Sequence, residues 1–123
     1  MKTTGFTETQ KQSLLDLLII GMYADHNLTS AENACVVRLL DTFQFSSDYE
    51  RKQFCDAAFT RASRHTGSPE AIRAYVTQVA GNFPTRDLRR GVYDTLSILL
   101  TNDGRITTEE SQLLGTVREI FQS

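Results

Sequence analysis

The chain has 123 residues, the length of one domain, and it is long enough to bury a hydrophobic core without disulfides or structural metals. Hydrophobic residues make up 40% of it and charged residues 23%, which is close to the composition of an ordinary soluble domain. The net charge of −2 excludes a bulk electrostatic attraction to nucleic acid or to an anionic membrane.

The opening residues, MKTTGFTETQKQS, have no apolar stretch behind the lysine and so do not resemble a signal peptide. The longest run without strongly polar residues, 17–24, is far shorter than the roughly 20 residues that a transmembrane helix needs. Cys35 and Cys55 lie inside helical patterns without CxxC spacing, which favours reduced, buried thiols over a disulfide. We therefore expect a cytoplasmic protein with no transmembrane segment.

The first helix is expected around residues 14–22, where leucine, isoleucine and methionine make it apolar on nearly every side. This pattern is typical of a central helix that its neighbours bury. Thr7 with Gln10 offers a capping box for the start of the helix. A second helix follows over residues 36–43, whose apolar side chains recur at i, i+3, i+4 and i+7.

Further apolar stripes with the helical period follow along the chain. They are expected to form helices over residues 54–62, 72–79, 88–100 and 113–121. Ser47 with Glu50 caps the first of these, and Ser68 followed by Pro69 begins the second. No segment alternates polar and apolar residues for long enough to form a strand. The sequence therefore predicts one all-α domain over residues 1–123, a bundle of about six helices.

The two ends of the chain repeat one pattern. YADHNLTSAENACVVRLLDTF can be laid over TNDGRITTEESQLLGTVREIF, which pairs Asp25 with Asp103 and Glu32 with Glu110. Each half contains a helix, a short acidic turn and a second helix, which predicts two similar helical hairpins. The expected hairpins cover approximately residues 8–44 and 86–122.

Helix capping explains most of each turn. Thr29 and Thr107 are placed as N-caps, and a glutamate follows each of them at N3, which completes a capping box. Asp25 and Asp103 instead fall at helix C-termini, where the macrodipole disfavours an anion. An Asx-turn would compensate for this placement and is the structural alternative. Because an aspartate stands at this unfavourable position in both copies, a functional role for it stays open.

ADHNLTSAE and NDGRITTEE, each after an apolar helix, resemble the acidic ADG-x-[apolar]-x-x-x-E hairpins of TerB-like domains, a family named for tellurite-resistance protein B. His26 stands where the family usually has glycine, and Asn102 where it usually has alanine. The resemblance implies a helical bundle, a bacterial stress-response or membrane-associated signalling context, and metal binding by the acidic turns. On this chain the metal-binding role would fall on Asp25, Glu32, Asp103 and Glu110.

Neither turn alone is a calcium-binding EF-hand loop. Such a loop needs glycine at its sixth position and glutamate at its twelfth, where the first copy has Ser30 and Val36. Arg105 at the third position of the second copy would repel a cation. Only convergence of both turns would gather enough carboxylates for Ca²⁺ or Mg²⁺. The alternative is that these residues serve capping alone.

Positive charge is concentrated in the middle of the chain. Residues 48–90 hold eight lysines and arginines against five acidic residues, whereas the rest of the chain is acidic. The arginines that could form a basic patch for an acidic protein partner are Arg61, Arg64, Arg86, Arg89 and Arg90. The alternative is a solvated face with i,i+4 ion pairs. Aromatic residues are not interleaved with the basic ones, which argues against single-stranded nucleic acid as the partner.

No catalytic motif occurs in the sequence, neither a G-x-S-x-G elbow, nor HExxH, nor a P-loop, and we assign no catalytic residue. The leading hypothesis is a non-enzymatic TerB-like domain, linked by resemblance to tellurite resistance and stress response, whose acidic turns bind a divalent cation. The first alternative is a metal-free helical adaptor that docks an acidic partner through its basic middle surface. The second is a metal-dependent hydrolase with its substrate over the acidic cluster.

Overall fold

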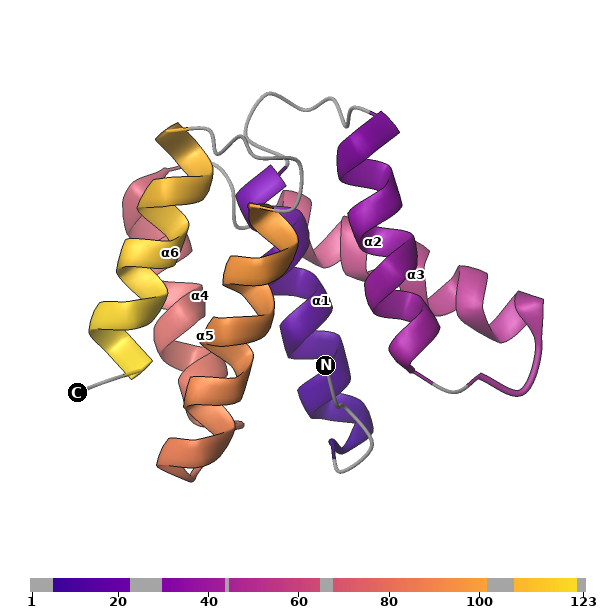
Figure 1. Cartoon of the computed structure of the whole chain (residues 1–123), viewed down its shortest axis with the longest axis horizontal. Helices are drawn as coiled ribbons and strands as arrows, with labels where there is room; N and C mark the ends of the chain where they lie inside the picture. Colours follow the sequence, from indigo (N-terminus) through magenta and orange to yellow (C-terminus); the bar gives the residue numbers. More distant parts are fainter. Residues whose placement is uncertain (1–5, 23–29, 44, 65–67, 102–107, 122–123) are drawn as a thin grey trace.

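The computed structural model describes residues 6–22, 30–43, 45–64, 68–101 and 108–121. Within these ranges the chain forms six α-helices and no β-strand, which confirms the predicted all-α fold (Figure 1). The helices are α1 (Glu8–Met22), α2 (Ser30–Thr42), α3 (Asp48–Ser63), α4 (Pro69–Ala80), α5 (Arg86–Leu100) and α6 (Thr108–Phe121). The turns that carry the predicted hairpin repeat lie outside these ranges, and the repeat stays a prediction.

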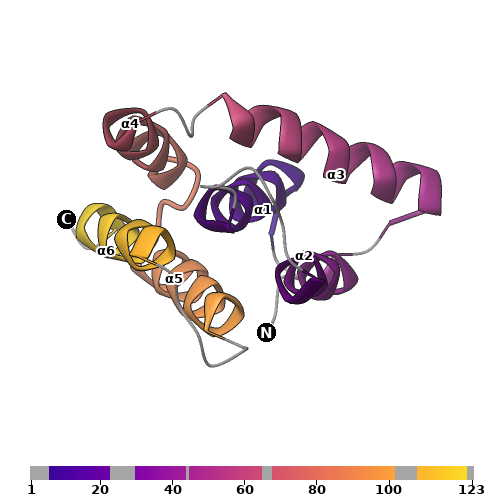
Figure 2. The same cartoon turned by 90° about the horizontal axis from the view of Figure 1, so that it is seen from above.

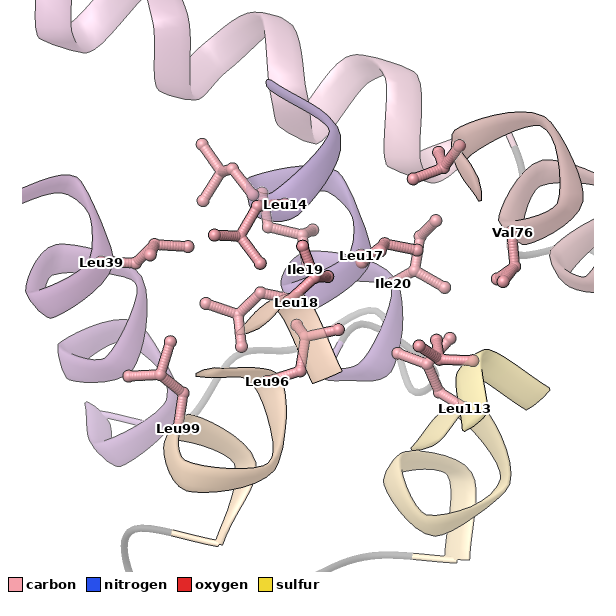
Figure 3. Packing of buried hydrophobic residues seen from close by; sticks show 14 of the residues in the cluster. Leu14, Leu17, Leu18, Ile19, Ile20, Leu39, Val76, Leu96, Leu99 and Leu113 are labelled. Carbon is pink, nitrogen blue, oxygen red and sulfur yellow. The ribbon is translucent and has the colours of Figure 1, made fainter. Parts of the chain in front are cut away.

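Helix α1 is the centre of the bundle, and it packs against each of the other five helices. Figure 2 shows it between α3 on one side and α5 with α6 on the other. Its apolar side chains from Leu14 to Ile20 are buried, and leucines of α2, α5 and α6 surround them (Figure 3). The predicted central helix is therefore confirmed, because an apolar surface on all sides needs neighbours on all sides.

Side-chain caps determine where the helices begin. At α1 the Thr7 amide donates to Gln10 Oε1 at 2.9 Å and the Gln10 amide donates to Thr7 Oγ1 at 3.1 Å, which is the predicted capping box. At α4 the Ser68 hydroxyl oxygen accepts a hydrogen bond from the Ala71 amide at 3.1 Å, and Pro69 occupies the first turn as predicted.

Helix α3 begins at the predicted cap, since the Glu50 amide donates to Ser47 Oγ at 3.1 Å. The Glu50 carboxylate reaches back to the Ser46 amide at 3.2 Å, one residue earlier than a regular capping box. Only Ala58 and Ala62 of this helix are buried, and they face α1. Small side chains at this contact allow α3 to pack closely against α1. Figure 2 shows α3 running across α1, which is seen nearly end-on.

The apolar stripes predicted for the second and the last helix belong to the core. The buried side chains are Val36, Leu39, Leu40 and Phe43 on α2, and Leu113, Leu114, Val117 and Phe121 on α6. The described residues on the opposite face of α6 are mostly polar or charged, whereas on α2 the apolar Val37 is exposed beside Arg38 and Asp41. Within the described ranges, no helix combines the length and the apolar surface that crossing a membrane requires.

Cys55 on α3 is a free, half-buried thiol. Burial, with the nearby Asp56 carboxylate as a smaller cause, raises the pKa of this thiol above its ordinary value. The thiol is therefore protonated at neutral pH, which makes it a poor nucleophile. The side chain of Cys35 lies outside the described part of the structure.

Candidate functional site

A basic pocket lies between α5 and α6, where the first turns of α5 run beside the last turns of α6 (Figure 1). Its volume is about 630 Å³, and it is lined by Arg86, Arg89, Arg90, Tyr93 and Asp94 of α5 and by Arg118 and Phe121 of α6. The α5 residues recur at three- and four-residue spacing, so they share one face of the helix. We call this site the arginine pocket.

Arg89 is held in place by the end of α4. Its Nε donates to the Phe83 carbonyl at 2.7 Å, and its Nη2 donates to the Ala80 carbonyl at 3.1 Å. Ala80 ends α4, so its carbonyl has no partner within the helix, and the guanidinium donates to it beside the Phe83 amide. Arg89 is half-buried as a result. It joins α4 to α5 and places a fixed cation at the edge of the arginine pocket.

The side chains of the other three arginines of the pocket are exposed. Arg86, Arg90 and Arg118 form no ion pair with another described residue. Asp94 is the single acidic residue among the described side chains that line the pocket. Four guanidinium groups against one carboxylate give this pocket a strongly positive potential.

The arginines of α5 stand at the unfavourable end of their helix. Helix α5 begins at Arg86, after the Thr85 cap whose Oγ1 accepts from the Leu88 amide at 3.1 Å. The positive end of the helix dipole disfavours cations there, and Asp87 is the only acidic residue in the first turn. Hydrogen bonds to the end of α4 account for Arg89, but helix stability does not account for Arg86 in the first turn. A bound anion would remove the conflict, because helix N-termini and arginines both attract anions.

Arg61, on α3, and Arg64, the C-cap of α3, do not line the arginine pocket. Arg61 donates from Nε to Asp16 Oδ2 at 2.9 Å and from Nη2 to Oδ1 at 3.0 Å. The Tyr75 hydroxyl donates to the same Oδ2. Because Asp16 is only 1% exposed, these partners satisfy a carboxylate that water does not reach. Arg61 thus joins α3 to α1, whereas Arg64 is exposed at the end of α3.

The pKa values of both partners of the buried Asp16 carboxylate are raised. Its hydrogen bond to Arg61 is the main cause that raises the pKa of this guanidinium. Burial is the main cause that raises the pKa of Tyr75 above its ordinary value of 10.0, and the hydrogen bond to Asp16 adds to it. Both groups therefore keep their protons near neutral pH. The arrangement suits a structural role better than proton transfer.

The predicted metal ligands lie only partly within the described residues. Asp25 and Asp103 are outside them, as is the side chain of Glu32 on α2. Glu110 is buried on α6, at 5% exposure, and is engaged in an interaction there. In the part of the chain that the structure describes, no group of three or more His, Cys, Asp or Glu side chains could hold a metal ion. The four-carboxylate site stays a prediction.

The helix ends that flank the two acidic turns lie at the same end of the bundle (Figure 1). A Cβ atom on Gly21, near the end of α1, would lie 2.7 Å from Leu113 Cδ2 of α6 and 3.5 Å from Leu100 Cδ1 of α5. The absence of a side chain at Gly21 allows this close approach. The end of α1, the end of α5 and the first turns of α6 therefore meet.

Sequence reasoning misses two residues that matter here. Asp16 stands inside the apolar run of residues 14–20, and that position was a usable signal, because a carboxylate on a helix buried on all sides needs a partner. Arg118 carries no comparable signal. Its place beside Arg86 and Arg90 comes from the packing of α6 on α5, which spacing within one helix does not encode.

Comparisons with models of protein families, with curated proteins and with solved structures found no match to this chain. The resemblance to TerB-like domains therefore rests on the two acidic segments alone.

Proposed function

We propose that this chain is a non-enzymatic helical interaction domain that binds an acidic protein partner at the arginine pocket. The observation that carries the proposal is the pocket itself, where four arginines and one aspartate line a single depression. Arginine is a preferred residue for binding carboxylates and phosphates, because its planar fork of donors matches two acceptor oxygens at once.

The charge distribution supports a protein partner over nucleic acid. The chain has a net charge of −2, which gives it no bulk attraction to a phosphate backbone, and the arginines of the pocket lie on α5 and α6 alone. Tyr93 and Phe121 line the pocket with the arginines, so that a partner side chain would find both apolar and cationic contacts. Interfaces between proteins combine these two kinds of contact, and arginine is enriched in them.

The test is binding of a fluorescent glutamate-rich peptide to the full chain, measured by anisotropy at low and moderate salt. We expect Arg86→Ala with Arg90→Ala to weaken binding at least tenfold and to reduce its salt dependence. The control, Lys52→Ala with Arg64→Ala, removes the same charge from exposed positions of α3 and should leave binding within about twofold. Equal losses in both double variants would show that only net charge matters and would refute the pocket as the docking site.

A second candidate function is binding of a divalent cation by the acidic turns, as the resemblance to TerB-like domains implies. The close approach of Gly21 to Leu113 and Leu100 favours it, because it brings together the helix ends from which both turns depart. If both turns converge, their four carboxylates would suit Ca²⁺ or Mg²⁺. A hydrolase that uses this cation would need the same site, so it depends on the same result.

Thermal unfolding in chelator, Ca²⁺, Mg²⁺, Mn²⁺ and Zn²⁺ tests the cation site. A metal at about a hundred times its dissociation constant should stabilise the fold by roughly 2.7 kcal/mol. Asp25→Asn with Asp103→Asn should abolish that gain, while Asp41→Asn with Asp94→Asn, which removes the same charge elsewhere, should preserve it. An unchanged melting temperature in every metal would eliminate the cation site and the hydrolase together.

A further inference from the structure

We propose that the arginine pocket recognises a phosphorylated side chain on the partner, a phosphate monoester carried by a peptide, rather than an acidic segment in general. This inference rests on the proposed function and deepens it. It follows from three features of the pocket: the excess of guanidinium groups over carboxylates, the fixed position of one arginine and the placement of the cations at the start of α5.

The number of uncommitted donors is the first feature. Arg86, Arg90 and Arg118 are exposed and pair with no other described residue. A carboxylate carries one charge and two oxygens, and a single arginine satisfies it bidentately. A phosphate monoester carries about −1.5 to −2 charges and three acceptor oxygens, so it can engage two or three guanidinium groups at once. The excess positive charge in the pocket matches a phosphate better than a carboxylate.

The fixed arginine is the second feature. Nε and Nη2 of Arg89 are occupied by the Phe83 and Ala80 carbonyls, while its Nη1 donates to none of the described residues. An arginine locked by backbone carbonyls loses little side-chain entropy when it binds an anion. The exposed side chains of Arg86 and Arg90 lie one turn apart on the same helix. They can then bind the same anion that Arg89 contacts.

The position on α5 is the third feature. The first turn of the helix adds the positive end of the dipole to the charges of Arg86, Arg89 and Arg90. These like charges repel one another and the dipole when the pocket is empty. A dianion relieves more of this repulsion than a monoanion does, so the preference for phosphate increases with every cation that the site gathers. The pocket volume of about 630 Å³ leaves room for the residues that flank the phosphate.

The experiment compares three degenerate peptide libraries that differ only at a fixed central position, which holds phosphoserine, glutamate or serine. Binding to the full chain is measured by anisotropy at pH 7.5 and at pH 5. We expect the phosphoserine library to bind at least tenfold more tightly than the glutamate library at pH 7.5. Because the second pKa of a phosphate monoester is near 6, this advantage should shrink at pH 5, where the glutamate is still largely ionised.

The variants locate the effect. Arg86→Ala with Arg90→Ala should remove the preference for phosphoserine, and Lys52→Ala with Arg64→Ala should preserve it. Equal affinity for the phosphoserine and glutamate libraries would overturn phosphate recognition and leave the acidic-partner proposal standing. Failure of both libraries to bind would overturn both proposals. If the preference for phosphoserine survives the loss of Arg86 and Arg90, the phosphate binds at another site, and this assignment of the pocket is overturned.

Discussion

The guanidinium of Arg61 and the carboxylate of Asp16 form two parallel hydrogen bonds across the contact between α3 and α1, at 2.9 and 3.0 Å. Asp16 is 1% exposed at its side chain, whereas Arg61 is 31% exposed, so the pair has one buried and one partly wet partner. The Tyr75 hydroxyl adds a third bond from α4. One carboxylate thereby joins three helices, and its charge is tolerated only while its partners remain.

Arg61→Ala should destabilise the fold by about 3 kcal/mol, near the lower limit for breaking a buried ion pair, because Arg61 is partly exposed and Tyr75 still donates to Asp16. Urea unfolding followed by circular dichroism measures the loss. The matched control is Arg51→Ala, which removes the more exposed pair with Asp41 and should cost about 1 kcal/mol or less. Similar losses in both variants would contradict a special role for the buried carboxylate.

Stability should decline at alkaline pH through Tyr75. Because burial raises the pKa of Tyr75 in the folded chain, the unfolded chain loses this proton first. The stability that Tyr75 contributes is complete below its ordinary value of 10.0 and is lost as the pH rises above it. Urea unfolding from pH 8 to 11 should show this decline, and Tyr75→Phe should flatten it. The series is best run with Cys55→Ala, since the raised pKa of that thiol produces a similar decline from lower pH.

Periodicity and capping predicted most of this fold because both act over one or two turns of helix. The apolar surface on nearly all sides of residues 14–22 indicated a central helix, and the capping residues at Thr7 and Ser68 indicated where helices begin. These signals depend on residues three or four positions apart, which the sequence displays directly. The structure bears them out for that reason.

The candidate site was only partly predictable. Arg86, Arg89 and Arg90 stood out as a basic cluster, but Arg118 joins them through packing between helices. Arg61 was grouped with them by charge alone, and its partner Asp16 lies 45 positions away. Charge counts along the sequence do not distinguish a cation that faces solvent from one that neutralises a buried carboxylate. The distinction needs the tertiary contact.

Gly21→Ala should destabilise the fold by about 1–3 kcal/mol, because the new methyl group would lie 2.7 Å from the buried Leu113 Cδ2 and crowd the junction of α1, α5 and α6. Gly115→Ala is the control, since nothing lies within 4 Å of a Cβ there, and it should stabilise α6 by about 0.5–1 kcal/mol. Thermal unfolding measures both. Adding Leu113→Val to Gly21→Ala should recover part of the loss, and a stabilising Gly21→Ala would disprove the close approach.

Substitution of Arg89 should lower the stability of the fold, whereas charge reversal at Arg86, three residues earlier on α5, should raise it. Arg89→Ala removes the donors to the Phe83 and Ala80 carbonyls and should destabilise the junction of α4 and α5 by about 1–3 kcal/mol. Arg86→Glu places an anion at the first helical position and should stabilise the fold by about 0.3–1 kcal/mol at low salt, with a smaller gain at high salt. The same variant should weaken binding of the phosphoserine library. If Arg86→Glu stabilises the fold and weakens binding, the arginine at this position serves a ligand. If the variant loses both stability and binding, Arg86 supports the helix itself.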